Sequence, residues 1–272
     1  MFENILTRQE FFSLSLRNLY CASGYSFYRM SRFEDYDFYA SQKDFLSSAN
    51  ILAFTDPSGT LKALRPDVTL SIIKNARPGR YCYSENVYRV PDNSDSFREF
   101  PQSGIEYLGC RGEESAEVLR LAVMSLRTLS EGRRITLSVA DAGEVLRLSR
   151  GLNVKEITKC LAGKNIHGLK ELRVPQELIA LAELDCPIAD SLPLFPESAA
   201  EILRSLEDFS DEIRVDFSAV NKLMYYDGIV FKGYIDGLAR EVLSGGHYTV
   251  MNKSGAGFAV YLDRLEAKNS WG

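Results

Sequence analysis

The sequence predicts an α+β fold in which an antiparallel sheet is flanked by helices. Three observations indicate it. A strand, a polar loop and a returning strand occupy residues 81–109, and an amphipathic helix follows at 113–131. Segments rich in β-branched and aromatic residues return at 213–217, 226–234 and 238–244. We expect a single core domain over residues 1–272, with a mostly helical insertion at about 141–210.

The N-terminal part alternates helices with short strands. Apolar residues recur near a 3.6-residue period over 8–22, which predicts a helix that Gly24 ends in the left-handed conformation. Strands are predicted at 25–33, 51–56 and 60–64. The segment Asp56–Gly59 predicts a turn, because proline presets φ and glycine tolerates positive φ. A helix then begins near Pro66.

The hairpin is predicted to display polar side chains on one face. Its first arm ends at Arg89, a loop breaks the strand, and the second arm carries Arg98, Gln102 and Glu106. Even spacing on a strand places Arg89, Gln102 and Glu106 on one face. A guanidinium there can pair with the carboxylate of an amino acid, while the other groups accept from an ammonium or ring N–H. Without a ligand, we expect Glu106 or water to pair with Arg89.

The C-terminal half is expected to return from helix to strand. The helix at 113–131 carries glutamates in its first turns and Arg127 near its end, which matches the helix dipole, and Gly132 stops it. A strand is predicted at 135–139. Four prolines interrupt the helical stretch that follows: Pro175, Pro187, Pro193 and Pro196. A glycine-led strand and a helix are expected at 255–268.

Composition argues against several classes of protein. The chain has 32 Lys+Arg and 37 Asp+Glu, a net charge of −5, and no basic run, so we expect no tRNA binding. Five cysteines without a C-x-x-C spacing indicate reduced thiols, and only two histidines argue against a metal site; we expect no cofactor. No apolar run approaches the ~20 residues of a membrane span, and the N-terminus lacks a signal-peptide core, so a cytoplasmic location is expected.

Several sequence blocks, in order, resemble the class II aminoacyl-tRNA synthetases and, within them, the histidyl-tRNA synthetases. The hairpin resembles motif 2 through Arg89, the run Arg98–Gln102 and Glu106. FTDPSGTLKALRPDVT at 54–69 resembles a family block that ends in LRPE-x-T, with Asp67 in place of Glu; YYDGIVF at 225–231, GGHY at 245–248 and a motif 3 with Arg264 follow. The resemblance implies an amino-acid pocket lined by Asp67, Thr69, Arg89, Gln102, Glu106, Tyr225 and Tyr226.

The nucleotide side departs from the synthetase pattern. Asn221 stands where the family has an arginine, and Val90 and Pro91 follow Arg89 where a glutamate would meet adenine. The family's GGRYD becomes GGHYT around His247, and Tyr261 is bulky for motif 3. We also expect the chain to lack the family's anticodon-binding domain. Adenylate formation needs preorganised positive charge, and each lost donor costs on the order of 10²–10³ in rate. We therefore expect no catalytic residues.

This combination resembles the regulatory subunits of ATP phosphoribosyltransferase, which are paralogues of the histidyl-tRNA synthetases. The resemblance implies a non-catalytic chain that activates a short catalytic subunit in the first step of histidine biosynthesis and supports feedback by histidine. It also implies a homodimer through residues 8–33 within a hetero-oligomer. Histidine could bind either the pocket or the subunit interface. The alternatives are a stand-alone amino-acid adenylating ligase and an amino-acid sensor with another partner.

Single residues also have structural interpretations that compete with these roles. Asp67 can stabilise the start of a helix, and Arg89 can pair across the hairpin with Glu99 or Glu106. Because His247 follows two glycines, we expect it to be a loop residue rather than a catalyst.

Overall fold

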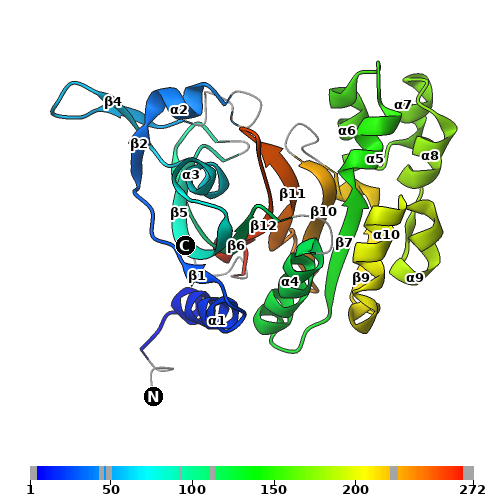
Figure 1. The fold of residues 1–272 in the computed structure, drawn as a ribbon, viewed down its shortest axis with the longest axis horizontal. Helices are drawn as coiled ribbons and strands as arrows, with labels where there is room; N and C mark the ends of the chain where they lie inside the picture. Colours follow the sequence, from blue (N-terminus) through cyan, green and yellow to red (C-terminus); the bar gives the residue numbers. More distant parts are fainter. Residues whose placement is uncertain are drawn as a thin grey trace. The chain divides into compact units, whose positions relative to one another are not determined.

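The computed structural model describes residues 5–42, 46, 51–91, 94–110, 114–220 and 226–265 (Figure 1). The chain forms two compact units. The first unit comprises residues 1–108 and 259–272, and the second comprises residues 109–258. Each unit combines strands of a sheet with helices that pack on it, as the α+β prediction requires.

The first unit is organised around the predicted hairpin. Strands β5 (Gly79–Arg89) and β6 (Arg98–Leu108) pair antiparallel over their full length. β1 (Ser26–Phe27) adds to β5 in the parallel sense, which gives the order β1-β5-β6. The strand predicted at 25–33 is therefore wrong in extent, because the chain leaves β5 after β1 and joins a different sheet.

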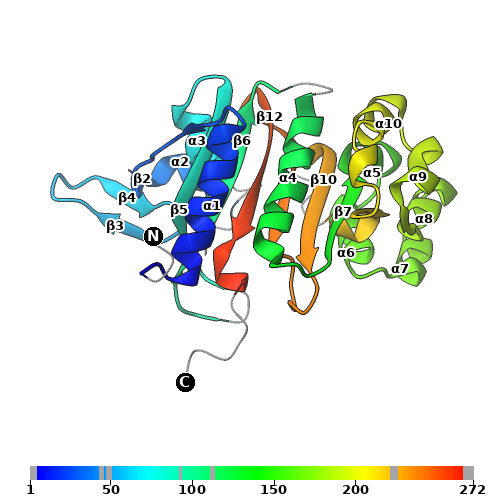
Figure 2. The ribbon, with the colours of Figure 1, turned by 90° about the horizontal axis from the view of Figure 1, so that it is seen from below.

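Helices cover both faces of this hairpin. α1 (Arg8–Ala22) begins with a capping box at Thr7, and it buries one stripe made of Phe12, Leu16 and Tyr20. Figure 2 shows α1 lying along β5 and β6. The Ser13 hydroxyl lies 2.6 Å from that of Ser84, so α1 faces the even-numbered residues of β5. The short helix α3 (Val68–Asn75) packs on the opposite face.

A second, three-stranded sheet belongs to the same unit. β2 (Phe33–Asp35), β4 (Leu61–Leu64) and β3 (Ala53–Thr55) pair antiparallel in that order, and α2 (Tyr36–Ala40) follows β2. The predicted turn between β3 and β4 is confirmed. The Asp56 carboxylate accepts from the backbone N–H groups of Ser58 (2.9 Å) and Thr60 (3.0 Å), and Gly59 has φ +82°.

The second unit is built on six strands in the order β12-β11-β10-β7-β9-β8. Their bounds are β7 (Ile135–Asp141), β8 (Asp185–Pro187), β9 (Ile213–Asp216), β10 (Tyr226–Ile235), β11 (Leu243–Val250) and β12 (Lys253–Tyr261, with residues to Phe258 in this unit). β7 pairs with β10 antiparallel and with β9 parallel, so the sheet is mixed. The helix α4 (Glu114–Ser130) packs on β7 and β10, and the Leu126 side chain lies over Gly233.

The predicted helical stretch holds six α-helices: α5 (Ala142–Leu148), α6 (Val154–Ala162), α7 (Ile166–Glu171), α8 (Gln176–Ala182), α9 (Ile188–Ser191) and α10 (Glu197–Arg204). Short 3₁₀ turns lie at Leu192–Leu194, Glu207–Phe209 and Phe217–Ala219. The short strand β8 lies in the middle of this stretch and pairs with β9. Sequence periodicity missed it because three residues, one of them proline, give no pattern.

Two C-terminal predictions are corrected. The strand expected at 238–244 is displaced to β11, because Gly237 (φ +84°) turns the chain after β10. The motif 3 segment forms β12, and one 3₁₀ turn (Leu262–Arg264) follows in place of the expected helix. The rest of that prediction, from residue 266 on, lies outside the described residues.

Candidate functional site

The register of β5 and β6 places the predicted row of polar residues on one face. Arg89 lies opposite Arg98, and Glu85 lies opposite Gln102. Directly opposed residues of an antiparallel pair project to the same side, so Arg89, Gln102 and Glu106 share a face. Gln102 and Glu106 are buried, with 4% and 2% of their surfaces exposed. An amide and a carboxylate are thus held out of bulk water on the face that α3 covers.

The Glu106 carboxylate is paired with α3. Thr69, in the first turn of this helix, donates a 2.5 Å hydrogen bond from Oγ1 to Oε1 of Glu106. Tyr83 lies on the same face of the hairpin and is also buried. Burial raises the pKa of Tyr83 well above its ordinary value, and the nearby negative charges of Glu106 and Asp67 raise it further. The phenol therefore stays protonated and neutral beside the carboxylate.

Asp67 occupies the N-cap of α3. Its Oδ1 accepts from the backbone N–H of Leu70 at 2.9 Å, while its backbone stays extended. This is the structural role that the sequence allowed for Asp67. The cap also fixes where α3 begins, and with it the direction in which Thr69 projects toward Glu106.

The buried cation of this region is Arg65, which sequence reasoning did not select. Arg65 is fully buried, and its Nη2 lies 2.6 Å from Oε2 of Glu85. The same guanidinium donates to the carbonyl oxygens of Ser31 (2.8 Å) and Asn86 (3.0 Å). One side chain thus joins the segment before β2, the strand β5 and the segment that leads into α3. The LRP tripeptide was the only sequence signal for it.

Arg89 lies at the outer end of the row and is only half-buried. Four residues of strand, or about 13 Å, separate Gln102 from Glu106, and the Arg89–Arg98 pair lies as far again beyond Gln102. Within the described part of the chain Arg89 forms no ion pair. Of the two partners expected for Arg89, Glu106 or water, Glu106 does not pair with it, because the strand holds the two residues apart and the Glu106 carboxylate accepts from Thr69.

The two predicted tyrosines belong to the second unit. Tyr225 lies outside the described residues, as do Asn221 and its neighbours to Met224. Tyr226 is the first residue of β10 and is half-buried. Its ring lies against Gly246, where an added Cβ would come within 2.8 Å of the ring and of the Ile229 carbonyl oxygen. Glycine at this position of β11 is therefore required by close packing.

His247 lies within β11, so the loop predicted for it is wrong. Its Nδ1 is 2.7 Å from Oδ1 of Asp227 on β10, and the ring lies beside Gly228. Burial acts to raise the pKa of Asp227, but hydrogen bonds from His247 and Thr249 outweigh it and leave that pKa lowered. The residue that replaces the family's arginine is thus held by a carboxylate of the same sheet.

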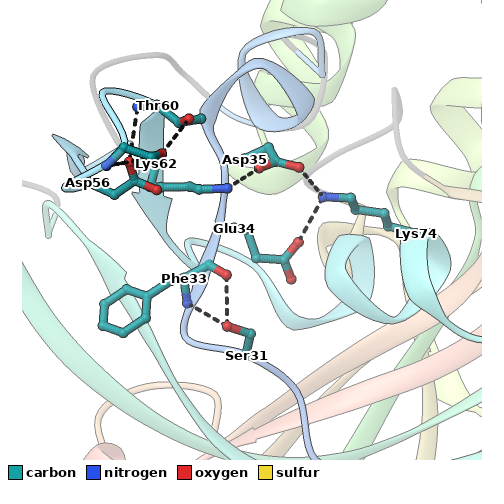
Figure 3. Close-up of polar contacts among 9 residues, drawn as sticks. Ser31, Phe33, Glu34, Asp35, Asp56, Thr60, Lys62 and Lys74 are labelled. Carbon is teal, nitrogen blue, oxygen red and sulfur yellow. Dashed lines mark hydrogen bonds and ion pairs between the residues drawn. The ribbon is translucent and has the colours of Figure 1, made fainter.

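A separate charged network joins β2 to α3 (Figure 3). Lys74 Nζ lies 3.2 Å from Glu34 and 3.5 Å from Asp35, and Lys62 Nζ lies 2.6 Å from Asp35. The buried Glu34 also accepts a hydrogen bond from Ser71. A cavity of about 350 Å³ adjoins this network, but both lysines and both acids already have partners. We assign the network a structural role.

The described nucleotide-side positions keep the departures seen in the sequence. β5 ends at Arg89, so Val90 and Pro91 follow the strand directly. The guanidinium of Arg264 lies over the ring of Tyr261, 4.0 Å from its centroid. The motif 3 arginine therefore stacks on the bulky residue of its own segment.

Over the described parts of the chain, no group of three or more His, Cys, Asp or Glu side chains is arranged to hold a metal ion. The described helices include none that is long and apolar enough to span a bilayer.

A family model for histidyl-tRNA synthetase matches residues 6–265. The chain belongs to the histidyl-tRNA synthetase family. Among curated proteins it is similar to the ATP phosphoribosyltransferase regulatory subunit of Caldanaerobacter subterraneus subsp. tengcongensis, with 28% identity over 267 residues that cover 80% of this chain and 69% of the relative. The regulatory subunit of Clostridium botulinum strain 657 is 26% identical over 295 residues, covering 92% and 69%.

Solved structures share the fold. An ATP phosphoribosyltransferase regulatory subunit/histidyl-tRNA synthetase from Bacillus halodurans superposes with a TM-score of 0.78 at 23% identity, covering 94% of this chain and 78% of that one. A chain of the ATP phosphoribosyl transferase (HisG:HisZ) complex from Thermotoga maritima gives 0.75 at 20% identity, covering 94% and 98%. The class II synthetase-like fold predicted from the sequence is confirmed.

Proposed function

We propose that this chain is the regulatory subunit of ATP phosphoribosyltransferase. It associates with a short catalytic chain, activates it, and supports feedback by histidine in the first step of histidine biosynthesis. In that step ATP and phosphoribosyl pyrophosphate give phosphoribosyl-ATP, and the chemistry takes place on the partner. The observation that carries the proposal is similarity over most of the chain to relatives that bear this name.

A non-catalytic role is consistent with the nucleotide-side residues. Adenylate formation would need donors aimed at the phosphate and carboxylate. Here His247 is held by Asp227, and Arg264 lies over Tyr261. We expect no pyrophosphate exchange with ATP and any amino acid, histidine included. Robust exchange in purified protein would instead support the stand-alone adenylating ligase.

The amino-acid side supplies a candidate histidine pocket on the first unit. The buried Glu106 carboxylate and Gln102 amide are acceptors for an ammonium or a ring N–H, and Thr69 orients the carboxylate. Asp67 adds a second negative charge at the start of α3. Arg89, on the same face, is the cation that we propose for the carboxylate of the ligand. Histidine is the ligand that we propose for it.

A homodimer through residues 8–33 is the proposed core of the assembly. α1 buries Phe12, Leu16 and Tyr20 inside its own unit and leaves Phe11 and Leu14 exposed at 43% and 50%. Apolar side chains so exposed on a helix suit contact with a second copy. Light scattering should report a dimer for the native chain and a smaller species for Leu14→Glu. Met251→Glu, at another exposed apolar residue (51%), is the control and should leave the dimer intact.

The decisive experiment co-expresses this chain with a short ATP phosphoribosyltransferase catalytic chain from the same genome. We expect the two to co-purify, and phosphoribosyl-ATP formation to depend on this chain. A catalytic chain that is equally active alone, or that does not co-purify, would contradict the proposal.

A gel-shift titration with tRNA at physiological salt should show no binding tighter than the non-specific range of ~10⁻⁴–10⁻⁶ M.

The histidine pocket is tested separately in the same complex. Glu106→Gln keeps the shape but removes the charge, so we expect about 10–100-fold weaker inhibition by histidine with activation retained. Glu34→Gln is a matched control, because Glu34 is another buried carboxylate that accepts a hydrogen bond from a hydroxyl group of α3, that of Ser71. Calorimetry of histidine against the isolated chain and against the complex distinguishes the pocket from the subunit interface. Unchanged inhibition in Glu106→Gln would place the effector elsewhere.

A further inference from the structure

Two cysteines of the first unit bring their sulfur atoms together. Cys21 lies in the last turn of α1 and Cys82 lies in β5, and their Sγ atoms are 3.8 Å apart. Cys21 is exposed to solvent, whereas Cys82 is fully buried. The pair lies apart from the proposed pocket. Cys82 projects toward α1, whereas Glu106 and the odd-numbered residues of β5 project from the opposite face of the hairpin.

The surrounding residues hold the two thiols in place. Cys82 stands in register with Phe27 on β1 and Ile105 on β6, so strands flank it on both sides. One turn before Cys21, Arg17 stacks over the Phe27 ring at 3.6 Å from the centroid. Two turns before it, Ser13 meets Ser84 at 2.6 Å. α1 is therefore fixed against β5 along the row that ends in the two cysteines.

We infer that Cys21 and Cys82 form a dithiol modification site that reacts with low-molecular-weight disulfides and closes to a disulfide between α1 and β5. In the first step the Cys21 thiol loses its proton to solvent, and its sulfur attacks one sulfur of the small disulfide. A mixed disulfide forms on Cys21, and one small thiol leaves. In the second step Cys82 loses its proton and attacks Sγ of Cys21, which releases the second small thiol. The protein is oxidised by two electrons, and the small disulfide is reduced to two thiols.

The order of the steps follows from exposure and charge. Of the two cysteines, only Cys21 is exposed to a soluble reagent. Burial, together with the neighbouring Cys21 and its hydrogen bond, raises the pKa of Cys82 to about 12, and Arg17 acts in the opposite sense. Once Cys21 carries the small thiol, its sulfur is part of a disulfide and has no proton to lose. Cys82 then faces a disulfide sulfur as its nearest partner, which favours closure over release of the adduct.

The test treats the full chain with oxidised glutathione and follows it by intact mass and peptide mapping. We expect a product lighter by two hydrogens, in which the peptides of Cys21 and Cys82 are linked, and which dithiothreitol reverses. Cys82→Ala should stop at a glutathione adduct on Cys21, and Cys21→Ser should give neither product at these sites. A Cys160→Ser/Cys186→Ser double variant, which lacks two half-buried cysteines, should still form the link.

The decisive measurement is made on the unsubstituted protein, so a misfolded variant cannot obscure it. The linked form should also unfold at a higher temperature than the reduced form, because the bond closes a long loop in the unfolded chain. A lasting glutathione adduct on Cys21 without closure overturns the inference. So does a link to Cys110, Cys160 or Cys186 in place of Cys82, or reaction of those cysteines while Cys21 stays unmodified.

Discussion

The guanidinium of Arg65, with no exposed surface, lies 2.6 Å from the carboxylate of Glu85, whose side chain is 14% exposed. Glu85 stands directly opposite Gln102 on the hairpin face that carries the candidate site. Arg65 therefore connects the backbone of the segment before β2 to the strand that faces the pocket. The candidate site is therefore supported by a buried ion pair, Arg65–Glu85, whose members lie beside the proposed ligand-binding residues and are not among them.

Removing one member of this pair should destabilise the fold strongly. Arg65→Ala leaves the Glu85 carboxylate without its cation and three carbonyl oxygens without the donor that Arg65 supplies, so we expect a loss of about 3–5 kcal/mol in the free energy of unfolding. Arg89→Ala removes a half-buried arginine and should cost less than about 1 kcal/mol. Urea denaturation measures both. Equal effects at the two positions would show that Arg65 is not the structural cation.

The cap of α3 can be separated from any ligand role of Asp67. Asp67→Ala loses the acceptor for the Leu70 N–H, and we expect about 1 kcal/mol of destabilisation. Asp67→Asn keeps an N-cap acceptor but loses the charge, so stability should stay near that of the native chain. Thermal unfolding measures the first effect, and histidine inhibition of the complex measures the second. If Asn is as destabilising as Ala, the carboxylate acts through more than the cap.

Gly245 should tolerate no side chain. An added Cβ would lie 2.2 Å from the carbonyl oxygen of Gly257 and 2.5 Å from Cβ of Phe258, so the neighbouring backbone would have to move. We expect Gly245→Ala to cost at least about 3 kcal/mol or to prevent folding. Gly163→Ala is the control, because the nearest atom to its Cβ is the Lys159 carbonyl oxygen at 3.4 Å. Comparable soluble yield and stability for both variants would contradict the packing.

Acid should weaken the attachment of β8. Hydrogen bonds from Arg214 lower the pKa of Asp185, burial acts to raise it, and Lys164 adds to the lowering. A carboxyl whose pKa is lowered by folding stabilises the fold above its unfolded value, about 3.9, and that stabilisation is lost as the pH falls through the folded value. The side chain is 53% exposed, so Asp185→Asn should cost less than about 1 kcal/mol at pH 7.

The measurement for Asp185 compares urea midpoints of the native chain and Asp185→Asn from pH 7 down to the acid limit of folding. The difference should shrink as the pH falls below about 4, and it should also shrink in high salt at neutral pH. A difference that stays constant across this range would mean that the charge of Asp185 contributes nothing.

The sequence by itself determined the hairpin, the helix after it and the shared face of Arg89, Gln102 and Glu106. These features depend on local patterns: turn residues break strands, and a period of two or 3.6 residues sets which side chains share a face. Ordered motif blocks also indicated the family, since many positions across the chain agreed at once. The register observed between β5 and β6 is the one that this reasoning required.

Only the tertiary structure decided which groups pair within these elements. The spacing of β6 places Glu106 on the same face as Gln102, but its hydrogen bond with Thr69 depends on how α3 docks. Likewise Arg65 to Glu85, His247 to Asp227 and Cys21 to Cys82 join segments far apart in the sequence. Such pairings are set by how sheets and helices pack, and a local pattern carries no information about the distance between two distant segments. For the same reason the structure, and not the sequence, revealed the short strand β8, which exists because β9 lies beside it.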